Sequence, residues 1–100
     1  MSAEQNKQTL RRFYDNVWHA PDPDYDTYLA PEASSYREEI AALKASTPDV
    51  HFDLGEIVAE NDTVVAVWTT PSLPGEEGIS LWHFKDGKIT GRTAYRRDLA

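Results

Sequence analysis

Hydrophobic residues recur every three or four positions through the first part of the chain, which is the spacing of one buried helical stripe. The stripe comprises Leu10, Phe13, Tyr14, Val17 and Trp18. Ser2 and Gln5 have the spacing of a capping box at the start of a helix. Pro21 and Pro23 cannot continue a helix. The pattern therefore predicts a first helix from Ser2 to about residues 19–20.

Two shorter helical segments are predicted to follow. The second helix begins at Asp22-Pro23, an N-cap followed by proline at the first helical position, and ends at Pro31. The third begins at Ser35, where Glu38 completes another capping box, and ends before Pro48. The apolar face of this third helix carries Tyr36, Ile40 and Leu43.

After Pro48 the pattern changes to alternation with a period of two, which is typical of half-buried strands. Strands are predicted over Val50–Val58, Thr63–Thr70, Ile79–Phe84 and Ile89–Arg96, with a loop over Pro71–Gly78. Three helices followed by an antiparallel sheet of about four strands indicate an α+β fold in which the helices cover one sheet face.

The dipeptide Asp86-Gly87 predicts a tight hairpin and thereby a register for the last two strands. This register pairs Phe84 with Ile89, Trp82 with Gly91, and Ser80 with Thr93. The helices would then cover the face that carries Ser80, Trp82, Phe84, Ile89, Gly91, Thr93 and Tyr95. The outer face would carry Ile79, Leu81, His83, Thr90, Arg92, Ala94 and Arg96.

Composition restricts the class of protein. A chain of 100 residues is expected to form one domain over residues 1–100. It has no cysteine, which excludes disulfides and thiolate metal sites. A net charge of -7 argues against duplex nucleic acid or an anionic membrane as the partner. No apolar run is long enough for a membrane span or a signal peptide, so a cytoplasmic location is the default expectation.

Several segments together resemble the SnoaL-like branch of the NTF2-like superfamily. They are Arg11–Trp18, Asp22–Asp24, Tyr28–Pro31, Val58–Val65 and Phe84–Ile89, in an order and spacing that span nearly the whole chain. The resemblance implies a curved sheet wrapped around helices to form a cone with a ligand pocket at its open end. It also implies homodimers formed through the outer face of the sheet. The superfamily includes polyketide cyclases, ketosteroid isomerases, dehydratases and epoxide hydrolases.

The resemblance carries over only part of a catalytic set. Isomerases of this superfamily use a tyrosine in the first helix, a carboxylate base after the second, and an aspartic acid in the second-last strand. Tyr14 matches the tyrosine, and Ser80 stands where the acid would be. The segment that bears the base is shortened to residues 32–35. Arg92 and Ala94 occupy the positions of the His and Asp that SnoaL-like cyclases tend to carry.

The candidate site residues therefore have two interpretations each. Tyr14 is either a hydrogen-bond donor to a ligand, and the candidate catalytic residue, or an aromatic core residue. Trp18, Tyr36 and Trp82 either stack on a flat ligand or belong to the core. Ser80 is predicted to be a small residue facing the cavity. Arg92 would bind a carboxylate or phosphate, but the hairpin register favours the outer face.

The positions of the histidines favour structural roles over catalysis or metal binding. His19 lies at the end of the first helix, where a cation is stabilised by the helix dipole. His51 and Asp53 have the spacing of a metal site or proton relay on one strand face, but no third ligand is evident. No cofactor motif, such as a glycine-rich phosphate loop, is present. We therefore expect neither a metal nor a cofactor.

The shortened loops also predict a smaller pocket with a wider or partly collapsed mouth, since the rim residues of the cone are the ones missing.

Three hypotheses remain open. The protein is a small-molecule-binding protein or degenerate enzyme holding an apolar or aromatic ligand, or an active cyclase, isomerase or dehydratase without cofactor, or a dimeric assembly module acting through its outer sheet face.

Overall fold

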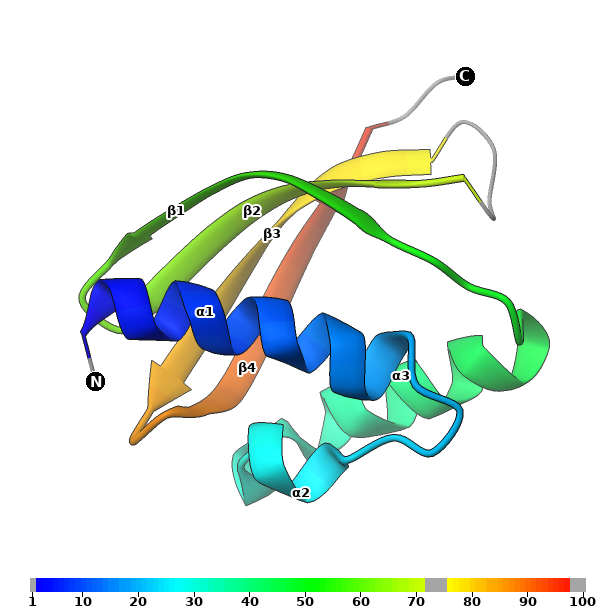
Figure 1. The fold of residues 1–100 in the computed structure, drawn as a ribbon, viewed down its shortest axis with the longest axis horizontal. Coiled ribbons are helices and arrows are strands. Elements are labelled where there is room, and N and C mark those ends of the chain that lie inside the picture. The colour runs from blue at the N-terminus through cyan, green and yellow to red at the C-terminus, as the bar shows by residue number, and fades with distance from the viewer. Residues whose placement is uncertain (1, 72–75, 98–100) are drawn as a thin grey trace.

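A curved antiparallel sheet covers three helices in two layers (Figure 1). The computed structural model describes residues 2–71 and 76–97. The helices are α1 (Ala3–Phe13), α2 (Tyr25–Tyr28) and α3 (Ser34–Ser46). The strands β1 (Asp53–Glu60), β2 (Thr63–Thr70), β3 (Glu76–Lys85) and β4 (Lys88–Arg96) lie side by side in chain order. This arrangement confirms the predicted α+β class with three N-terminal helices on a four-stranded sheet.

The first helix begins as the capping box predicts. The Ser2 hydroxyl accepts from the backbone N–H of Gln5, and the Gln5 side chain accepts from the backbone N–H of Ser2. The helix then changes character, because residues Tyr14–Trp18 form a turn of π-helix before the chain leaves the axis at His19. This wider turn brings Tyr14 and Trp18 to one side of the chain, with their rings stacked 6.2 Å apart.

The predicted caps of the next two helices are wrong. Asp24, not Asp22, caps α2, because its carboxylate accepts from the N–H of Thr27. The α3 helix starts at Ser34 and follows directly from a 3-10 turn over Pro31–Ala33. Ser35 is therefore the second residue of the helix and not its N-cap, and the predicted capping box does not form.

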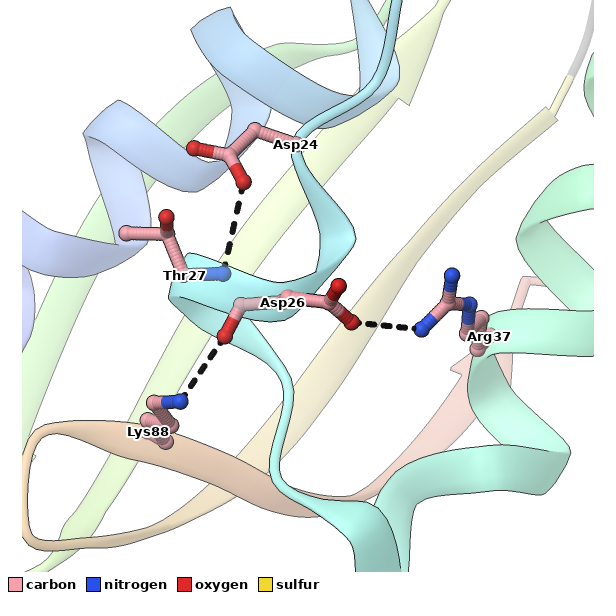
Figure 2. A network of polar contacts seen from close by, with 5 residues as sticks. All are labelled: Asp24, Asp26, Thr27, Arg37 and Lys88. Carbon is pink, nitrogen blue, oxygen red and sulfur yellow. Dashed lines mark hydrogen bonds and ion pairs between the residues drawn. The ribbon is translucent and has the colours of Figure 1, made fainter.

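Polar contacts fix α2 between α3 and the last hairpin (Figure 2). The Asp26 carboxylate lies 2.8 Å from the guanidinium of Arg37 on α3. The Asp26 carbonyl accepts from Lys88 Nζ at 2.8 Å. The chain after α2 then runs along β4, where the N–H of Ala30 donates to the carbonyl of Ile89. The short helix is thereby attached to both layers of the fold.

The strand bounds partly match the prediction. The predicted strand Thr63–Thr70 is confirmed in full as β2, and the turns at residues 61–62 and 86–87 are confirmed, with positive φ angles at Asn61, Asp86 and Gly87. The first strand starts at Asp53 instead of Val50. β3 starts at Glu76, so the predicted loop over Pro71–Gly78 is too long; its residues 72–75 lie outside the described part of the chain.

The register of the last hairpin departs from the prediction. Phe84 pairs with Ile89 as expected, but the next pair is His83 with Gly91, so Thr90 is an extra residue in β4. A β-bulge of this kind moves every later side chain to the opposite face. Trp82 therefore pairs with Arg92, and Ser80 with Ala94. Arg92, Ala94 and Arg96 belong to the inner face, while Thr93 and Tyr95 belong to the outer face.

The core lies between α1, α3 and the inner face of the sheet. Leu10, Phe13 and Val17 are fully buried along the predicted stripe of the first helix. Ile40 of α3 and Trp82 of β3 are also fully buried. Within residues 2–71 and 76–97, none of the helices has the length and apolar character that crossing a membrane requires.

Candidate functional site

A cavity of about 340 Å³ lies between α3 and the inner face of the sheet. This volume reaches the roughly 300 Å³ at which ligand pockets begin. The cavity is therefore large enough to hold a small ligand in spite of the short loops. The walls are mainly apolar, with five aromatic side chains, and come from the π-helical turn, α3, the segment before β1, and strands β2, β3 and β4. They include Tyr14, Trp18, Tyr36, Leu43, Phe52, Trp68, Ser80 and Arg92.

Tyr14 and Tyr36 bring two buried hydroxyls to the cavity. Burial is the largest cause that raises the pKa of Tyr14 well above its usual value, and the neighbouring Tyr36, also a hydrogen-bond partner, raises it further. Burial likewise raises the pKa of Tyr36. Both phenols therefore stay protonated at neutral pH and act as hydrogen-bond donors.

Two tryptophans lie near the Tyr36 hydroxyl, and only one of them lines the cavity. Trp82 donates to it from Nε1 at 3.3 Å and contacts Tyr14 edge-on, but Trp82 is fully buried behind the two phenols and does not line the cavity. Trp18 lines the cavity. Its Nε1 is close enough to the Tyr36 hydroxyl to lower the pKa of Tyr36, but it makes no hydrogen bond of regular geometry among the described residues.

Ser80 faces the cavity, in the orientation that the sequence predicts, and its hydroxyl already has a partner. Its Oγ accepts from Nε1 of Trp68 at 2.9 Å. Phe52, just before β1, packs against Trp68 and Trp18 with ring centroids 5.6 and 4.8 Å apart. Ser80 therefore orients Trp68, and the two tryptophans and Phe52 form one aromatic wall.

Arg92 lies in this cavity because of the bulge at Thr90, which corrects its predicted placement on the outer face. Its guanidinium lies 4.6 Å above the ring centroid of Tyr36, a cation–π contact. One terminal nitrogen pairs with the carboxylate of Glu39 on α3. The Arg92 side chain is only 15% exposed, and its Nε has no hydrogen-bond partner within the described residues.

Several cavity residues are absent from the sequence prediction. Glu39 lies three residues after Tyr36 and four before Leu43, so the helical period of α3 places it on their face. This spacing is the signal that would have found it. Arg96 and Glu76 form an ion pair of 3.4 Å at the cavity and were hidden by the incorrect hairpin register and loop bounds.

The histidine cluster lies beside the cavity wall. His19 stacks on His51 with ring centroids 4.3 Å apart, and the N–H of Phe52 donates to His19 Nε2 at 3.0 Å. His51 Nε2 lies 3.0 Å from a carboxylate oxygen of Asp53. Within the described ranges, His, Cys, Asp and Glu do not form a group of three that would hold a metal ion. His19 therefore positions Phe52 by accepting its backbone hydrogen bond.

The cavity is richer in donors than in free bases. Tyr14, Tyr36, Trp18 and Arg92 all present N–H or O–H groups. The carboxylates that line it among the described residues are Glu39 and Glu76, and each is paired with an arginine. The arrangement can bind an acceptor or stabilise negative charge on a ligand.

Comparison with solved structures supports the fold assignment. The chain is 24% identical to a proposed polyketide cyclase from Acidithiobacillus ferrooxidans, with a TM-score of 0.75 over 95% of this chain and 89% of the other. A proposed hydroxylase from Streptomyces galilaeus gives a TM-score of 0.75 at 15% identity, covering 95% and 80% of the two chains. A SnoaL-like protein of unknown function from Burkholderia thailandensis gives 0.72 at 18% identity, covering 98% and 99%.

These likenesses establish the NTF2-like fold and extend over most of each neighbour. The search of curated proteins found no match. The model of the SnoaL-like domain matches residues 3–92, which is most of the chain. The protein thus belongs to the SnoaL-like family.

Proposed function

We propose that the protein binds an apolar, aromatic small molecule in the cavity between α3 and the sheet. The observation that carries this proposal is the cavity of about 340 Å³ with aromatic walls and a small set of convergent polar groups. That combination is typical of small-molecule sites, where apolar walls supply affinity and a few polar groups fix orientation. Trp18, Phe52 and Trp68 supply the flat surfaces, and Tyr14 and Tyr36 supply hydroxyl donors.

A thermal-shift screen with neutral one-ring and two-ring aromatic compounds tests the proposal. Binding to the folded state raises the melting temperature as the ligand concentration exceeds its dissociation constant. Ala94 lines the cavity on β4, whereas Thr93 is exposed on the opposite face of the same strand. Ala94→Leu should weaken every hit at least about tenfold by filling the cavity, and Thr93→Leu should leave the hits unchanged. The proposal fails if no compound raises the melting temperature, or if Ala94→Leu leaves the affinity of the binding compounds unchanged.

A second candidate function is acid–base catalysis of the cyclase or isomerase type. It is favoured by the two neutral phenols, because hydroxyl donors stabilise the oxyanion that forms when a proton leaves the carbon next to a carbonyl. A β,γ-unsaturated cyclic ketone is a suitable probe, since its conversion to the conjugated isomer is followed by absorbance. Tyr14→Phe should lower the rate at least about tenfold, while the melting temperature falls only by the few degrees that the loss of one buried hydrogen bond costs. An unchanged rate, or no rate in the wild type, would exclude this function.

The outer sheet face supports a further proposal, that two copies form a homodimer. Val67, Ile79 and Tyr95 lie in adjacent register on β2, β3 and β4 and are 39%, 46% and 67% exposed. A contiguous exposed apolar patch is typical of a protein interface. Light scattering after size exclusion should give twice the chain mass for the wild type and one chain mass for Ile79→Lys. A wild-type monomer at high concentration would contradict the proposal.

A further inference from the structure

The cavity contains donors that the described residues leave unsatisfied. Nε of Arg92 and Nε1 of Trp18 are both buried, and neither has a hydrogen-bond partner among the described residues. Buried polar groups in native proteins are nearly always paired, so unpaired ones in a cavity wall indicate a place for an acceptor atom from elsewhere. The donors belong to two elements that line the cavity, the π-helical turn and β4.

A guanidinium that is paired with one carboxylate lies beside these donors. Arg92 lies over the Tyr36 ring, and its guanidinium lowers the pKa of both Tyr14 and Tyr36, although burial outweighs it. The field of the guanidinium therefore reaches both hydroxyls. Because the Arg92 side chain is mostly buried, this field is stronger than it would be at the surface. A negative group on a ligand would be stabilised here despite the overall charge of -7.

Glu39 restricts which negative group of a ligand Arg92 can bind. Its carboxylate pairs with a terminal nitrogen of Arg92, and the Glu39 side chain is 61% exposed. Nε stays available on the same planar guanidinium. A carboxylate of the ligand would pair with Arg92 but would also be repelled by Glu39. A doubly charged phosphate would meet that repulsion twice over, and the second arginine at the cavity, Arg96, is already paired with Glu76.

We propose that the ligand of this cavity is an aromatic carboxylic acid, bound as its monoanion. Its carboxylate lies between Arg92 and Trp18, and its rings lie against the aromatic wall of Phe52 and Trp68. This inference rests on the proposed binding of an aromatic ligand and adds the charged group that the ligand carries.

Calorimetric titration with 2-naphthoate and 2-naphthamide tests the inference. The two compounds share rings and shape, but only the naphthoate carries a charge at neutral pH. Naphthoate should bind at least about tenfold more tightly, since a charge-assisted hydrogen bond is roughly twice as strong as a neutral one. Equal affinities, or tighter binding of the amide, overturn the carboxylate while the proposed aromatic site stands. If neither compound binds, both the inference and the proposed function fail.

Charge variants on α3 provide an independent readout in a folded protein. Glu39→Gln removes the competing carboxylate and should raise naphthoate affinity about threefold to tenfold, with little effect on naphthamide. Glu38→Gln is the matched control, because it removes the same charge from an exposed neighbour that does not line the cavity. Equal effects of the two variants would mean that only the overall charge matters and would overturn the assignment of the carboxylate to Arg92.

Substitution of the arginine itself completes the test. Arg92→Met should reduce naphthoate affinity to that of naphthamide or below, and Arg92→Lys should restore only part of it, because lysine has the charge without the planar set of donors. Naphthoate affinity that survives Arg92→Met in a folded variant overturns the proposal. If Arg92→Met does not fold, the Glu39→Gln and Glu38→Gln comparison decides the question.

Discussion

Replacing Lys44 with methionine should destabilise the protein, because this amine holds the end of the helix that carries Trp18. Lys44 Nζ donates to three backbone carbonyls, those of Val17, Trp18 and Ala20, at 2.9, 2.8 and 2.9 Å. These carbonyls belong to the end of the π-helical turn or follow it, where backbone acceptors have no partner within the helix. Lys44 comes from α3, so the same contacts attach α3 to the first helix.

The size of the effect follows from these contacts. A hydrogen bond to a charged group contributes about 1.5–3 kcal/mol, and a cation at a helix C-terminus adds about 0.3–1 kcal/mol. Water would replace part of the loss, since Lys44 is only partly buried. We therefore expect Lys44→Met to lower the free energy of unfolding by about 2–3 kcal/mol. At about 4–8 °C per kcal/mol for a chain of this size, the melting temperature should fall by roughly 10–20 °C.

Urea unfolding followed by tryptophan fluorescence measures this effect. Lys88→Met is the matched control, because its amine makes one exposed hydrogen bond, to the carbonyl of Asp26. It should cost about 0.5–1 kcal/mol. The reasoning is refuted if Lys44→Met changes the free energy of unfolding by less than about 0.5 kcal/mol, the range of ordinary surface substitutions, or by no more than Lys88→Met.

Two further predictions concern pH and packing. Burial, the stacked His51 and Lys44 lower the pKa of His19 against the opposing charges of Asp15 and Asp53, so the folded state resists protonation of His19. Its contribution to stability is therefore complete above the unfolded pKa of about 6.5 and is lost as the pH falls through the lower folded pKa. Urea unfolding between about pH 7.5 and 5 should show a steeper loss for the wild type than for His19→Gln, and parallel curves would contradict this. Gly78→Ala should destabilise the protein by about 1–3 kcal/mol, because a Cβ there would lie 2.3 Å from the Tyr95 carbonyl oxygen. Gly91→Ala, which has open space around it, should be nearly neutral in the same unfolding assay, and equal effects would refute the packing argument.

Local sequence signals predicted the elements well wherever one residue pattern dominates. The stripe of Leu10, Phe13 and Val17 gave the buried face of the first helix, and Asp86-Gly87 gave the last hairpin. These features depend on neighbours within a few residues, so the sequence contains them directly. The π-helical turn at Tyr14–Trp18 has no such signal, because it depends on how that segment meets Lys44 and the rest of the fold.

The site was harder to predict because a single extra residue decides it. Thr90 is an ordinary strand residue, and its hydroxyl donates to the His83 carbonyl at the bulge. Without the bulge, Arg92 would lie on the outer face and Tyr95 on the inner one. The error did not affect the prediction for Tyr14, Trp18 and Tyr36, because they come from helices whose faces do not depend on the hairpin register. It did place Arg92 and Arg96 on the wrong face of the sheet.

The short loops leave room for a ligand. The short segments at residues 32–35 and 71–78 predicted a smaller pocket, and the cavity of about 340 Å³ still reaches the roughly 300 Å³ at which ligand pockets begin. Among the described residues, nearly all of its lining comes from helices and strands. The chain also covers 99% of the SnoaL-like neighbour from Burkholderia thailandensis, so a domain of this length is not peculiar to this protein.

The most direct test of the aromatic cavity is a titration with 2-naphthamide, followed by the indole N–H signal of Trp18 in the ¹H–¹⁵N NMR spectrum. Trp18 lines the cavity and its Nε1 has no partner among the described residues, so a ligand there must change its environment. The account predicts a saturable shift of the Trp18 signal that is weakened in Ala94→Leu and preserved in Thr93→Leu. A Trp18 signal that does not move, or that moves equally in both variants, would contradict the account.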